Sequence, residues 1–259
     1  QMRLAFGDRF NDSMLLDLSR MCYRNELLCF VELARLPRIG EEYMRRHVDV
    51  ADAELGRELK ASGRGVLIIT GHIGSWELQA HVADLCGYPI VALARPLKNP
   101  YLNATLNRFR TTRRNRIREK FDSLRSISQL AQEGNWVCFL YDQNGGPRDA
   151  FVPFFGVPAA TWRSAPFVHL KFDLPIVVCT LTRENWLGSR FKLNVHKVLH
   201  PEESRLREEP ELHVLHQIHE GFEEALRSHP EQWLWQHRRW KTRPPGENSR
   251  LVDGVPVFD

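Results

Sequence analysis

The hydrophobic pattern of the first 62 residues is typical of helices. A helix-start signal at Asn11-Asp12-Ser13 is followed by apolar residues at three- and four-residue spacing toward Leu36, and Pro37 and Gly40 interrupt the pattern. Two shorter helical patterns come next, so helices are expected over residues 12–36, 41–48 and 52–61. We therefore predict a helical N-terminal segment over residues 1–62, close to a membrane.

From residue 65 onward, short apolar runs alternate with helical stretches. The β-branched run Gly65–Thr70 is typical of a strand buried on both faces. Ser75 is expected to cap the helix that follows it. The strands expected from this pattern span residues 65–70, 89–95, 136–141, 175–181 and 191–199, and the helices span 75–85, 100–113, 124–132, 161–172, 209–228 and 232–240.

This alternation of strands and helices predicts the α/β class. A mainly parallel central sheet flanked by helices is the architecture that such an order favours. No linker rich in Pro, Gly or Ser divides the chain. We predict a single α/β domain over residues 63–245, preceded by the helical segment and followed by a tail over residues 246–259.

Polar residues follow three of the predicted strands. In parallel sheets, ligands bind beyond the carboxyl ends of the strands, which directs attention to residues 71–77, 95–101 and 142–148. The first of these stretches holds His72 and, five residues later, Glu77. On one continuous helix the two would lie about 140° apart, but a turn at His72 lets the carboxylate fold back onto the imidazole.

A carboxylate that holds one ring nitrogen of His72 raises the basicity of the other, which suits a general base. The helix N-terminus that follows could offer backbone N–H groups to an oxyanion or a phosphate. The plainer alternative is a capping histidine beside an unrelated surface Glu77. Asp142, at the end of the 136–141 strand, is a second acid that can face His72, unless it only forms an Asx turn. The sequence leaves open which acid contacts the ring, and Arg95 is either a phosphate ligand or a solvated strand end.

Composition and charge exclude several classes of protein. The 259 residues include 42% hydrophobic and 26% charged residues, and 36 Lys and Arg against 32 Asp and Glu leave a formal charge of +4. These proportions are globular. The longest apolar runs fall far short of the ~20 residues that a membrane span needs. Five scattered cysteines, with no C-x-x-C pair, favour neither a disulfide framework nor a zinc ribbon, and they suit a reducing compartment.

The sequence has two basic stretches, and the first favours an interaction surface over a solvated helix face, which normally mixes signs. The first carries seven cations against one acid: Arg108, Arg110, Arg113, Arg114, Arg116, Arg118 and Lys120, with Glu119. The second comprises Arg238, Arg239, Lys241 and Arg243. Trp233 and Trp235 precede it, and Trp240 lies within it. Such residues suit an anionic membrane surface, and nucleic acid or an acidic carrier protein are the alternatives.

Several common motifs are absent, among them GxxxxGK[ST], GxGxxG, GxSxG and HExxH. His213, His216 and His219 recur every three residues and could be mistaken for metal ligands. Without a second cluster of ligands, they are interpreted as the histidines of an amphipathic helix. No metal site is predicted.

Four blocks in order resemble the bacterial lipid A late acyltransferases, within the glycerolipid acyltransferases. The motif H-x-x-x-x-[DE] matches His72 to Glu77. The later blocks are Arg95-Pro96-Leu97-Lys98-Asn99-Pro100, then Asp142–Arg148 leading into Phe151–Ala159, and finally Pro230–Pro244, so that the resemblance covers roughly residues 15–245. The family usually carries an N-terminal membrane helix, which is missing here, and either truncation or a peripheral form of the protein would explain the difference.

The resemblance implies transfer of a fatty acyl chain from acyl carrier protein or acyl-CoA to a hydroxyl of a lipid A precursor, at the cytoplasmic face of the inner membrane. It implies His72 as the base, Glu77 as its motif partner and Asp142 as a second acid, with no covalent acyl-enzyme, no metal and no cofactor. Its substrate contacts would be Arg95, Asn99, Arg116, Gln143 and Arg148. The alternatives are another acceptor, such as a phosphatidylinositol mannoside or a lysolipid, or a non-catalytic protein that binds membranes or nucleic acid.

Overall fold

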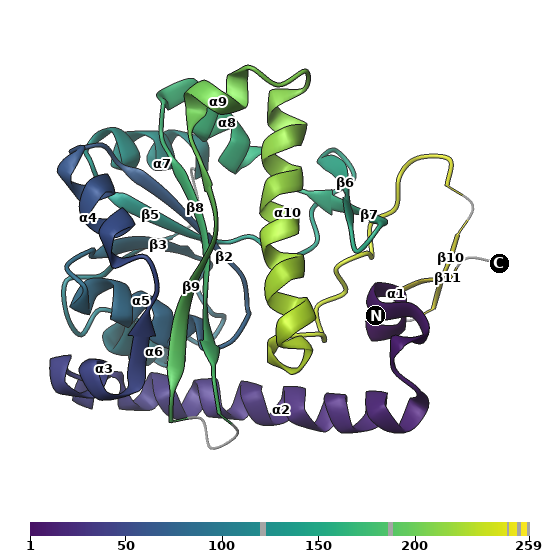
Figure 1. The fold of residues 1–259 in the computed structure, drawn as a ribbon, viewed down its shortest axis with the longest axis horizontal. Coiled ribbons are helices and arrows are strands. Elements are labelled where there is room, and N and C mark those ends of the chain that lie inside the picture. Colours follow the sequence, from purple (N-terminus) through teal and green to yellow (C-terminus); the bar gives the residue numbers. More distant parts are fainter. Residues whose placement is uncertain (120–122, 186–188, 248, 253–254, 258–259) are drawn as a thin grey trace.

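A computed structural model of the chain describes residues 1–119, 123–185, 189–247, 249–252 and 255–257. Its centre is a seven-stranded sheet with the strand order β1-β9-β8-β2-β5-β3-β4 (Figure 1). The strands are β1 (Val48–Val50), β2 (Val66–Thr70), β3 (Ile90–Ala94), β4 (Arg116–Glu119), β5 (Trp136–Leu140), β8 (Ile176–Arg183) and β9 (Phe191–Leu199). From β8 to β4 all neighbours are parallel, and β9 is antiparallel to β8. The predicted mainly parallel α/β sheet is confirmed.

Helices surround this sheet, and two hairpins lie outside it. The helices are α1 (Met2–Phe6), α2 (Asp12–Arg35), α3 (Glu41–His47), α4 (Ala53–Ala61), α5 (Trp76–Leu85), α6 (Pro100–Arg110), α7 (Ser123–Gln132), α8 (Ser164–Phe172), α9 (Pro201–Arg205) and α10 (Pro210–Ser228). Short 3-10 turns span Gly7–Arg9, Leu36–Arg38 and Pro230–Gln232. The hairpins pair β6 (Ala150–Phe154) with β7 (Val157–Thr161) and β10 (Arg250–Val252) with β11 (Val255–Val257). The N-terminal 62 residues are mainly helical, but β1 lies within them and pairs with β9.

The two faces of the sheet are packed differently, because side chains alternate along each strand. On β2, Leu67 and Ile69 belong to a large core cluster that includes residues of α7, α8 and α10. Ile68 belongs instead to a small cluster with Leu59 of α4 and with Val177 and Cys179 of β8. The face toward α4 therefore holds fewer packed side chains than the face toward α10.

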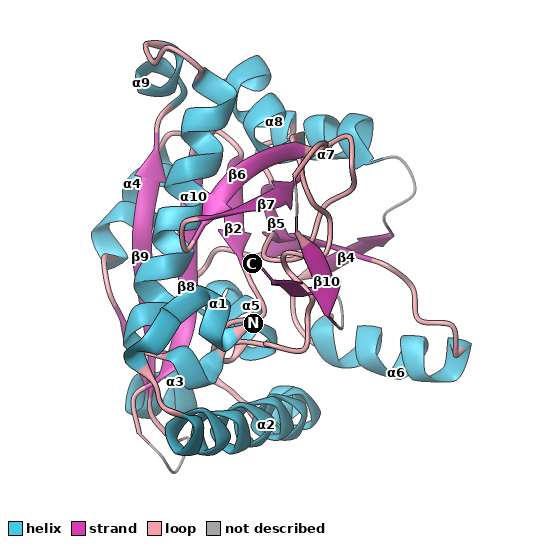
Figure 2. Cartoon of the chain, turned by 90° about the vertical axis from the view of Figure 1, so that its right-hand side faces the viewer, coloured by secondary structure: helices cyan, strands magenta, loops and turns pink. Residues whose placement is uncertain are grey.

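Helix α2 lies across the end of the sheet where β2 stops, against α5 and the Pro230–Gln232 turn (Figures 1 and 2). Asn11 caps it as predicted, accepting a hydrogen bond from the backbone N of Met14. Its inner face buries Leu18, Cys22, Asn25, Cys29, Glu32 and Leu33 at three- and four-residue spacing. Its outer face exposes Leu16, Tyr23, Leu27, Phe30 and Val31. No helix in the described part of the chain is long and apolar enough to span a bilayer.

The predicted helix over residues 232–240 is wrong. After the 3-10 turn the chain runs irregularly, and Trp233 pairs with Ile73 in an isolated β-bridge. Trp233, Trp235 and Trp240 are all buried in the main core cluster. The expectation that they accompany basic residues at a membrane surface is therefore also wrong for this stretch, because the indole rings fill the protein interior. The sequence could not show this, since aromatics beside cations suit both settings.

The β6–β7 hairpin was not predicted, and the helix expected from residue 161 begins at Ser164. Phe155 and Gly156 form the two-residue turn of the hairpin with φ angles of 51° and 75°. Two consecutive positive φ angles are the geometry that joins twisted antiparallel strands. Phe155 is an unusual residue for such a turn, so the turn gave no signal in the sequence. The edge strands β1 and β4 were missed because three or four residues are too few to show a period.

Candidate active site

His72 lies in the turn between β2 and α5, directly above the carboxyl end of the sheet. Its ring Nδ1 lies 3.0 Å from Oδ1 of Asp142, and its backbone N donates to Oδ2 of the same carboxylate at 2.8 Å. Gly71 makes this approach possible, because a Cβ there would lie 2.9 Å from Cγ of Asp142. Of the two acids that the sequence left open, Asp142 is therefore the one that contacts the imidazole.

Asp142 is buried and fully engaged in hydrogen bonds. It follows β5, the neighbour of β2 in the sheet, and its side chain is 1% exposed. Besides the two bonds from His72, Oδ2 accepts a hydrogen bond from Nε1 of Trp233 at 2.8 Å. These three donors fix both carboxylate oxygens and hold the plane of the imidazole.

The electrostatics of this pair oppose the effect of burial. Burial alone would raise the pKa of Asp142, but the imidazole of His72 and the hydrogen bond from Trp233 lower it below the usual range. Burial alone would likewise lower the pKa of His72, but the charge of Asp142, its hydrogen bond and the charge of Glu77 raise it above the ordinary value. With Nδ1 donating to Asp142, Nε2 is the ring nitrogen that can accept a proton.

Glu77, the acid of the motif, has a different partner. Nε of Arg110 donates to Oε2 of Glu77 at 2.9 Å, and Nη2 of Arg110 contacts Oε1, so the pair is bidentate. Glu77 lies in the first turn of α5 and Arg110 at the end of α6. The carboxylate therefore holds a guanidinium close to the imidazole of His72 instead of holding the ring itself.

A cavity of about 470 Å³ opens beside His72 and extends under the less densely packed face of the sheet. The end of the cavity beside His72, here called its mouth, has a polar lining that includes His72, Glu77, Arg95, Arg110 and Gln143, together with Trp76 and Trp162. Its wall is apolar and is lined by residues that include Leu59, Ile68, Ala92, Cys138, Val177 and Val195. It reaches Trp136, the first residue of β5, whose ring stacks on Tyr88 at 4.7 Å between centroids. An imidazole held by a buried carboxylate thus faces a long apolar cavity.

Comparison with known proteins shows the family of the chain. The profile of the bacterial lipid A biosynthesis acyltransferase family matches residues 4–242. The chain belongs to this family. The family resemblance inferred from the four sequence blocks is thereby confirmed.

Three curated relatives from Escherichia coli (strain K12) illustrate the similarity. The chain is 30% identical to the lipid A biosynthesis palmitoleoyltransferase over 212 residues, which are 81% of this chain and 66% of the relative. It is 26% identical to the lipid A biosynthesis lauroyltransferase over 256 residues, covering 90% of this chain and 82% of the relative. It is 24% identical to the lipid A biosynthesis myristoyltransferase over 216 residues, covering 83% and 65%. The chain thus spans slightly less than two thirds of the palmitoleoyltransferase and of the myristoyltransferase.

The structure of this family member separates the predicted substrate contacts into two groups. Arg95 and Gln143 line the mouth of the cavity. Asn99, Arg116 and Arg148 are not among the lining residues. The side-chain oxygen of Asn99 caps α6 by accepting from two backbone N–H groups, Arg116 contacts the side chain of Asn135, and Arg148 is exposed.

The first basic stretch is also divided by the fold. Arg110 and Arg114 are engaged in ion pairs, with Glu77 and Asp84. Arg108, Arg113 and Arg118 are exposed, whereas Lys120 lies outside the described residues. The stretch therefore contributes one cation, Arg110, to the cavity, and its five other described cations, including the engaged Arg114 and Arg116, are exposed.

Three residues near His72 were not assigned to the site from the sequence: Arg110, Trp233 and His237. The ring of His237 lies 5.0 Å from that of His72, and its Nε2 lies 3.1 Å from Nε2 of Gln143. Burial, followed by the nearby charge of His72, lowers the pKa of His237. Trp233 and His237 lie within the C-terminal block, but no local pattern shows that this block folds back over the turn of His72.

Two further expectations concern backbone donors and metals. The N–H groups of Gly74 and Ser75 donate to the carbonyls of Gln232 and Leu181 at 2.7 and 2.8 Å, so they are occupied by the fold. Within the described ranges, no group of three or more His, Cys, Asp or Glu side chains could hold a metal ion. His219 is buried on α10 and bonded to protein groups, as the amphipathic-helix interpretation requires.

Proposed function

We propose that this chain transfers a fatty acyl group from the thioester of acyl carrier protein or coenzyme A to a hydroxyl group of a lipid A precursor. The observation that carries this proposal is the position of His72, whose Nδ1 is held by buried Asp142 at the mouth of an apolar cavity. The names of the curated relatives, all lipid A biosynthesis acyltransferases, support lipid A as the acceptor.

The chemistry follows from the two ring nitrogens of His72. Nε2 removes the proton of the acceptor hydroxyl while its oxygen attacks the thioester carbonyl carbon. The C–S bond then breaks, and the departing thiolate takes the proton from the imidazolium, so no covalent acyl-enzyme forms. Asp142 orients the ring and stabilises its protonated state. Because a thioester is already activated, orientation, a base and stabilisation of the oxyanion suffice without a metal or cofactor.

The roles of Glu77 and Arg110 follow from their ion pair. The guanidinium of Arg110 lines the cavity close to His72, and Glu77 fixes its orientation with two hydrogen bonds. A planar cation held in this way suits the negative charge that develops on the carbonyl oxygen. We therefore assign Glu77 to holding Arg110 instead of to holding the base.

The cavity is the proposed site of the acyl chain. It follows β2 from Trp136, whose strand partner is Val66, to His72 beyond Thr70. At ~3.3 Å per residue the five residues of β2 span about 16 Å. Each methylene group buried there contributes roughly 0.8 kcal/mol to binding. An apolar chain of the donor thus places its carbonyl at the polar mouth, where Arg95 and Gln143 are the candidate contacts with the acceptor.

The partner surfaces are proposed from exposed groups. One exposed apolar stripe lies on α2 and suits shallow insertion into the headgroup region of the inner membrane from its cytoplasmic side. It comprises Leu16, Tyr23, Leu27, Phe30 and Val31.

Vesicles containing phosphatidylglycerol should bind the protein, and the double substitution Leu27→Glu with Phe30→Glu should weaken binding. Leu206→Glu is the matched control, because Leu206 is 86% exposed near α9. Equal binding by all three proteins would contradict this surface.

The acyl donor is tested by competition. Exposed Arg108, Arg113 and Arg118 favour acidic acyl carrier protein over coenzyme A, because they add a diffuse positive surface near α6. Purified protein is given both donors with different chain lengths, and mass spectrometry of the lipid product reports which chain is transferred. Transfer of the coenzyme A chain alone would contradict the carrier protein as donor.

The proposed activity itself is tested with the same assay. His72→Ala should abolish product, since loss of a general base alone costs about 10²–10⁴ in rate. His216→Ala is the matched control, because His216 is exposed on α10 and does not line the cavity. A folded His72→Ala protein with undiminished turnover would remove the mechanism, and a wild-type protein that acylates no lipid A precursor would remove the acceptor.

A further inference from the structure

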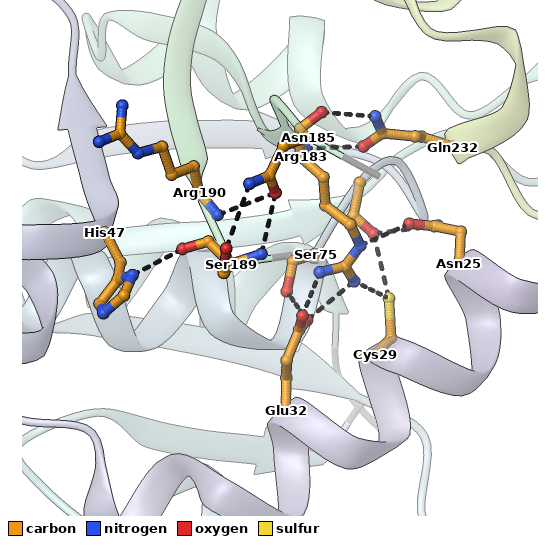
Figure 3. A network of polar contacts seen from close by, with 11 residues as sticks. Asn25, Cys29, Glu32, His47, Ser75, Arg183, Asn185, Ser189, Arg190 and Gln232 are labelled. Carbon is orange, nitrogen blue, oxygen red and sulfur yellow. Dashed lines mark hydrogen bonds and ion pairs between the residues drawn. The ribbon is translucent and has the colours of Figure 1, made fainter. Parts of the chain in front are cut away.

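A buried ion pair lies behind the turn that carries His72. Arg183, the last residue of β8, is 6% exposed, and Glu32 of α2 is 5% exposed. Nη2 of Arg183 lies 2.9 Å from Oε2 of Glu32, and Nη1 contacts Oε1 (Figure 3). Because both ions lose their water, a buried pair of this kind adds little net stability. Its geometry therefore needs another explanation.

The groups around Arg183 also bind the turn. Nε of Arg183 donates to Oδ1 of Asn25 at 2.9 Å, and Nδ2 of Asn25 donates to the carbonyl oxygen of Gly74 at 3.3 Å. The hydroxyl of Ser75 donates to the carboxylate of Glu32. Figure 3 shows these side chains converging on the guanidinium from α2 and from the turn. Gly74 and Ser75 are thus linked to the guanidinium of Arg183 through two side chains of α2, Asn25 and Glu32.

Cys29 provides a further link in the same network. Its thiol lies 3.1 Å from the carbonyl oxygen of Gly74, and its sulfur accepts from Nη2 of Arg183 at 3.3 Å. Burial raises the pKa of this thiol to about 12, so it stays protonated and can donate. The carbonyl of Gly74 is therefore held from two positions on α2.

The turn has little room to move elsewhere. Gly74 has a φ of +64°, and a Cβ there would lie 2.0 Å from the carbonyl oxygen of Leu181. Ser75 occupies the N-cap position of α5, as predicted, but its side chain makes no capping hydrogen bond, and its hydroxyl donates to Glu32. A hydroxyl that could cap its own helix is directed to the ion pair instead.

We propose that Glu32 and Arg183 are positioning residues of the acyl transfer, which hold Gly74 and Ser75 and thereby direct Nε2 of His72 into the cavity. This inference rests on the proposed function. Neither Glu32 nor Arg183 lines the cavity, so both act through the turn. The charged and titratable groups that face His72 itself are Asp142, Glu77, Arg110 and His237.

Ser75→Ala is the central test, because it cuts the direct link between Glu32 and the turn and leaves both contacts between Glu32 and Arg183 in place. A misplaced base should lower kcat roughly 10- to 100-fold, with KM for the acyl donor within about twofold of wild type. Leu18→Ala is the matched control, since Leu18 is buried on α2, the helix of Glu32, and makes none of these hydrogen bonds. A loss of activity in Ser75→Ala no larger than in Leu18→Ala would overturn the proposal.

A double-mutant cycle separates positioning from general loss of stability. If the hydroxyl of Ser75 acts through Glu32, then Ser75→Ala combined with Glu32→Met, which leaves no oxygen acceptor, should reduce kcat no further than Glu32→Met alone. Unfolding curves of each variant fix the temperature at which all are folded. Losses of kcat that multiply would show independent effects and would contradict the link. If Glu32→Met does not fold, the comparison of Ser75→Ala with Leu18→Ala still decides.

The ring of His72 can be observed without any substrate. Its NMR signal is assigned by its absence in His72→Gln, and its pKa is measured by titration. Ser75→Ala should lower this pKa relative to wild type, because a displaced ring loses part of its contact with Asp142, whereas Leu18→Ala should not. An unchanged pKa in Ser75→Ala would overturn the positioning role. Absence of acyl transfer by the wild-type protein would remove the proposed function and leave this measurement valid.

Discussion

His72 and His219 are two histidines of one core with opposite surroundings. Phe154 connects them, since its ring contacts both His219 and Trp233, and Trp233 donates to Asp142. His72 lies at the cavity with a carboxylate on Nδ1. His219 is enclosed by the β6–β7 hairpin, with the carbonyl of Pro153 on Nδ1 and the guanidinium of Arg239 on Nε2.

The charge of one neighbour decides what each imidazole can do. Burial lowers the pKa of both rings. At His72 the carboxylate of Asp142 outweighs burial, and the pKa rises above the ordinary value. At His219 the charge of Arg239 adds to burial, and the pKa falls to about 3. A buried histidine thus becomes a proton acceptor or a fixed neutral hydrogen-bonding group according to the sign of the charge beside it.

Removal of the charge beside His72 should have the largest effect. Asp142→Asn keeps the shape of the side chain but removes the negative charge that stabilises the protonated ring, so kcat should fall by roughly 10²–10⁴. Initial rates of acyl transfer measure the loss. His219→Gln, in the other region, should retain kcat once corrected for the folded fraction. Rates of Asp142→Asn within about threefold of wild type would show that the charge of Asp142 does not make His72 a better base.

The acidic limb of the pH–rate profile tests whether Asp142 raises the pKa of His72. A protonated His72 cannot accept a proton, so kcat/KM should fall about tenfold per pH unit below its pKa. An ordinary histidine has a pKa of about 6.5. Because Asp142 raises the pKa of His72, the fall should begin at a higher pH than it would for an ordinary histidine. In the residual activity of Asp142→Asn, the midpoint should move to lower pH. A midpoint that is the same in both proteins would assign the limb to another group.

Arg110 is a cation near His72, as Arg239 is near His219, but it lines the cavity and is paired with Glu77. Arg110→Lys keeps the charge but loses the bidentate contact with Glu77, and we expect a loss of about tenfold in kcat. Arg114→Lys is the matched control, since Arg114 pairs with Asp84 away from the cavity. Similar rates for the two variants would argue against a role for Arg110 in the reaction.

The smallest expected effect is on stability and arises at His219. Its unfolded form binds a proton below a pH of about 6.5, but its folded form does not until about pH 3. Between these values the unfolded state binds more protons, so the free energy of unfolding should fall with decreasing pH, by at most ~1.4 kcal/mol per pH unit from this group. Urea denaturation at several pH values measures the slope. The slope should be smaller in His219→Gln, and an unchanged slope would contradict burial of a neutral ring.

His72 should contribute to stability with the opposite sign. Its folded pKa is raised, so its contribution is present below the pKa of the unfolded chain and is lost as the pH rises through the folded pKa. Comparison of His72→Gln with His219→Gln therefore separates the two regions by the direction of the change in slope.

Elements with a long or pure hydrophobic pattern were predictable from the sequence. The 24-residue helix α2 and the buried strand β2 follow their predicted ranges closely. The carboxyl ends of β2, β5 and β3 meet because these strands are neighbours, as parallel topology led us to expect. By contrast, the β6–β7 hairpin turns at Phe155, and the chain after Gln232 follows the shape of the core instead of a local period.

The candidate site was predictable as a list of residue types but not as a set of contacts. His72 and Asp142 were both named from their places after strands, and the choice between Asp142 and Glu77 was left open. Glu77 turned out to hold Arg110, which lies 33 residues away in the sequence. Such a pairing depends on how α5 and α6 pack, and neither helix encodes it alone.

The sequence by itself determined the α/β class, the mainly parallel order, the family and the imidazole at the end of the first buried strand, because these depend on local periodicity and on short blocks of adjacent residues. Only the tertiary structure decided which acid holds that imidazole, which tryptophan holds the acid, and which cations are buried. Those outcomes depend on distances between residues far apart in the chain and on the water that packing removes from around each charge.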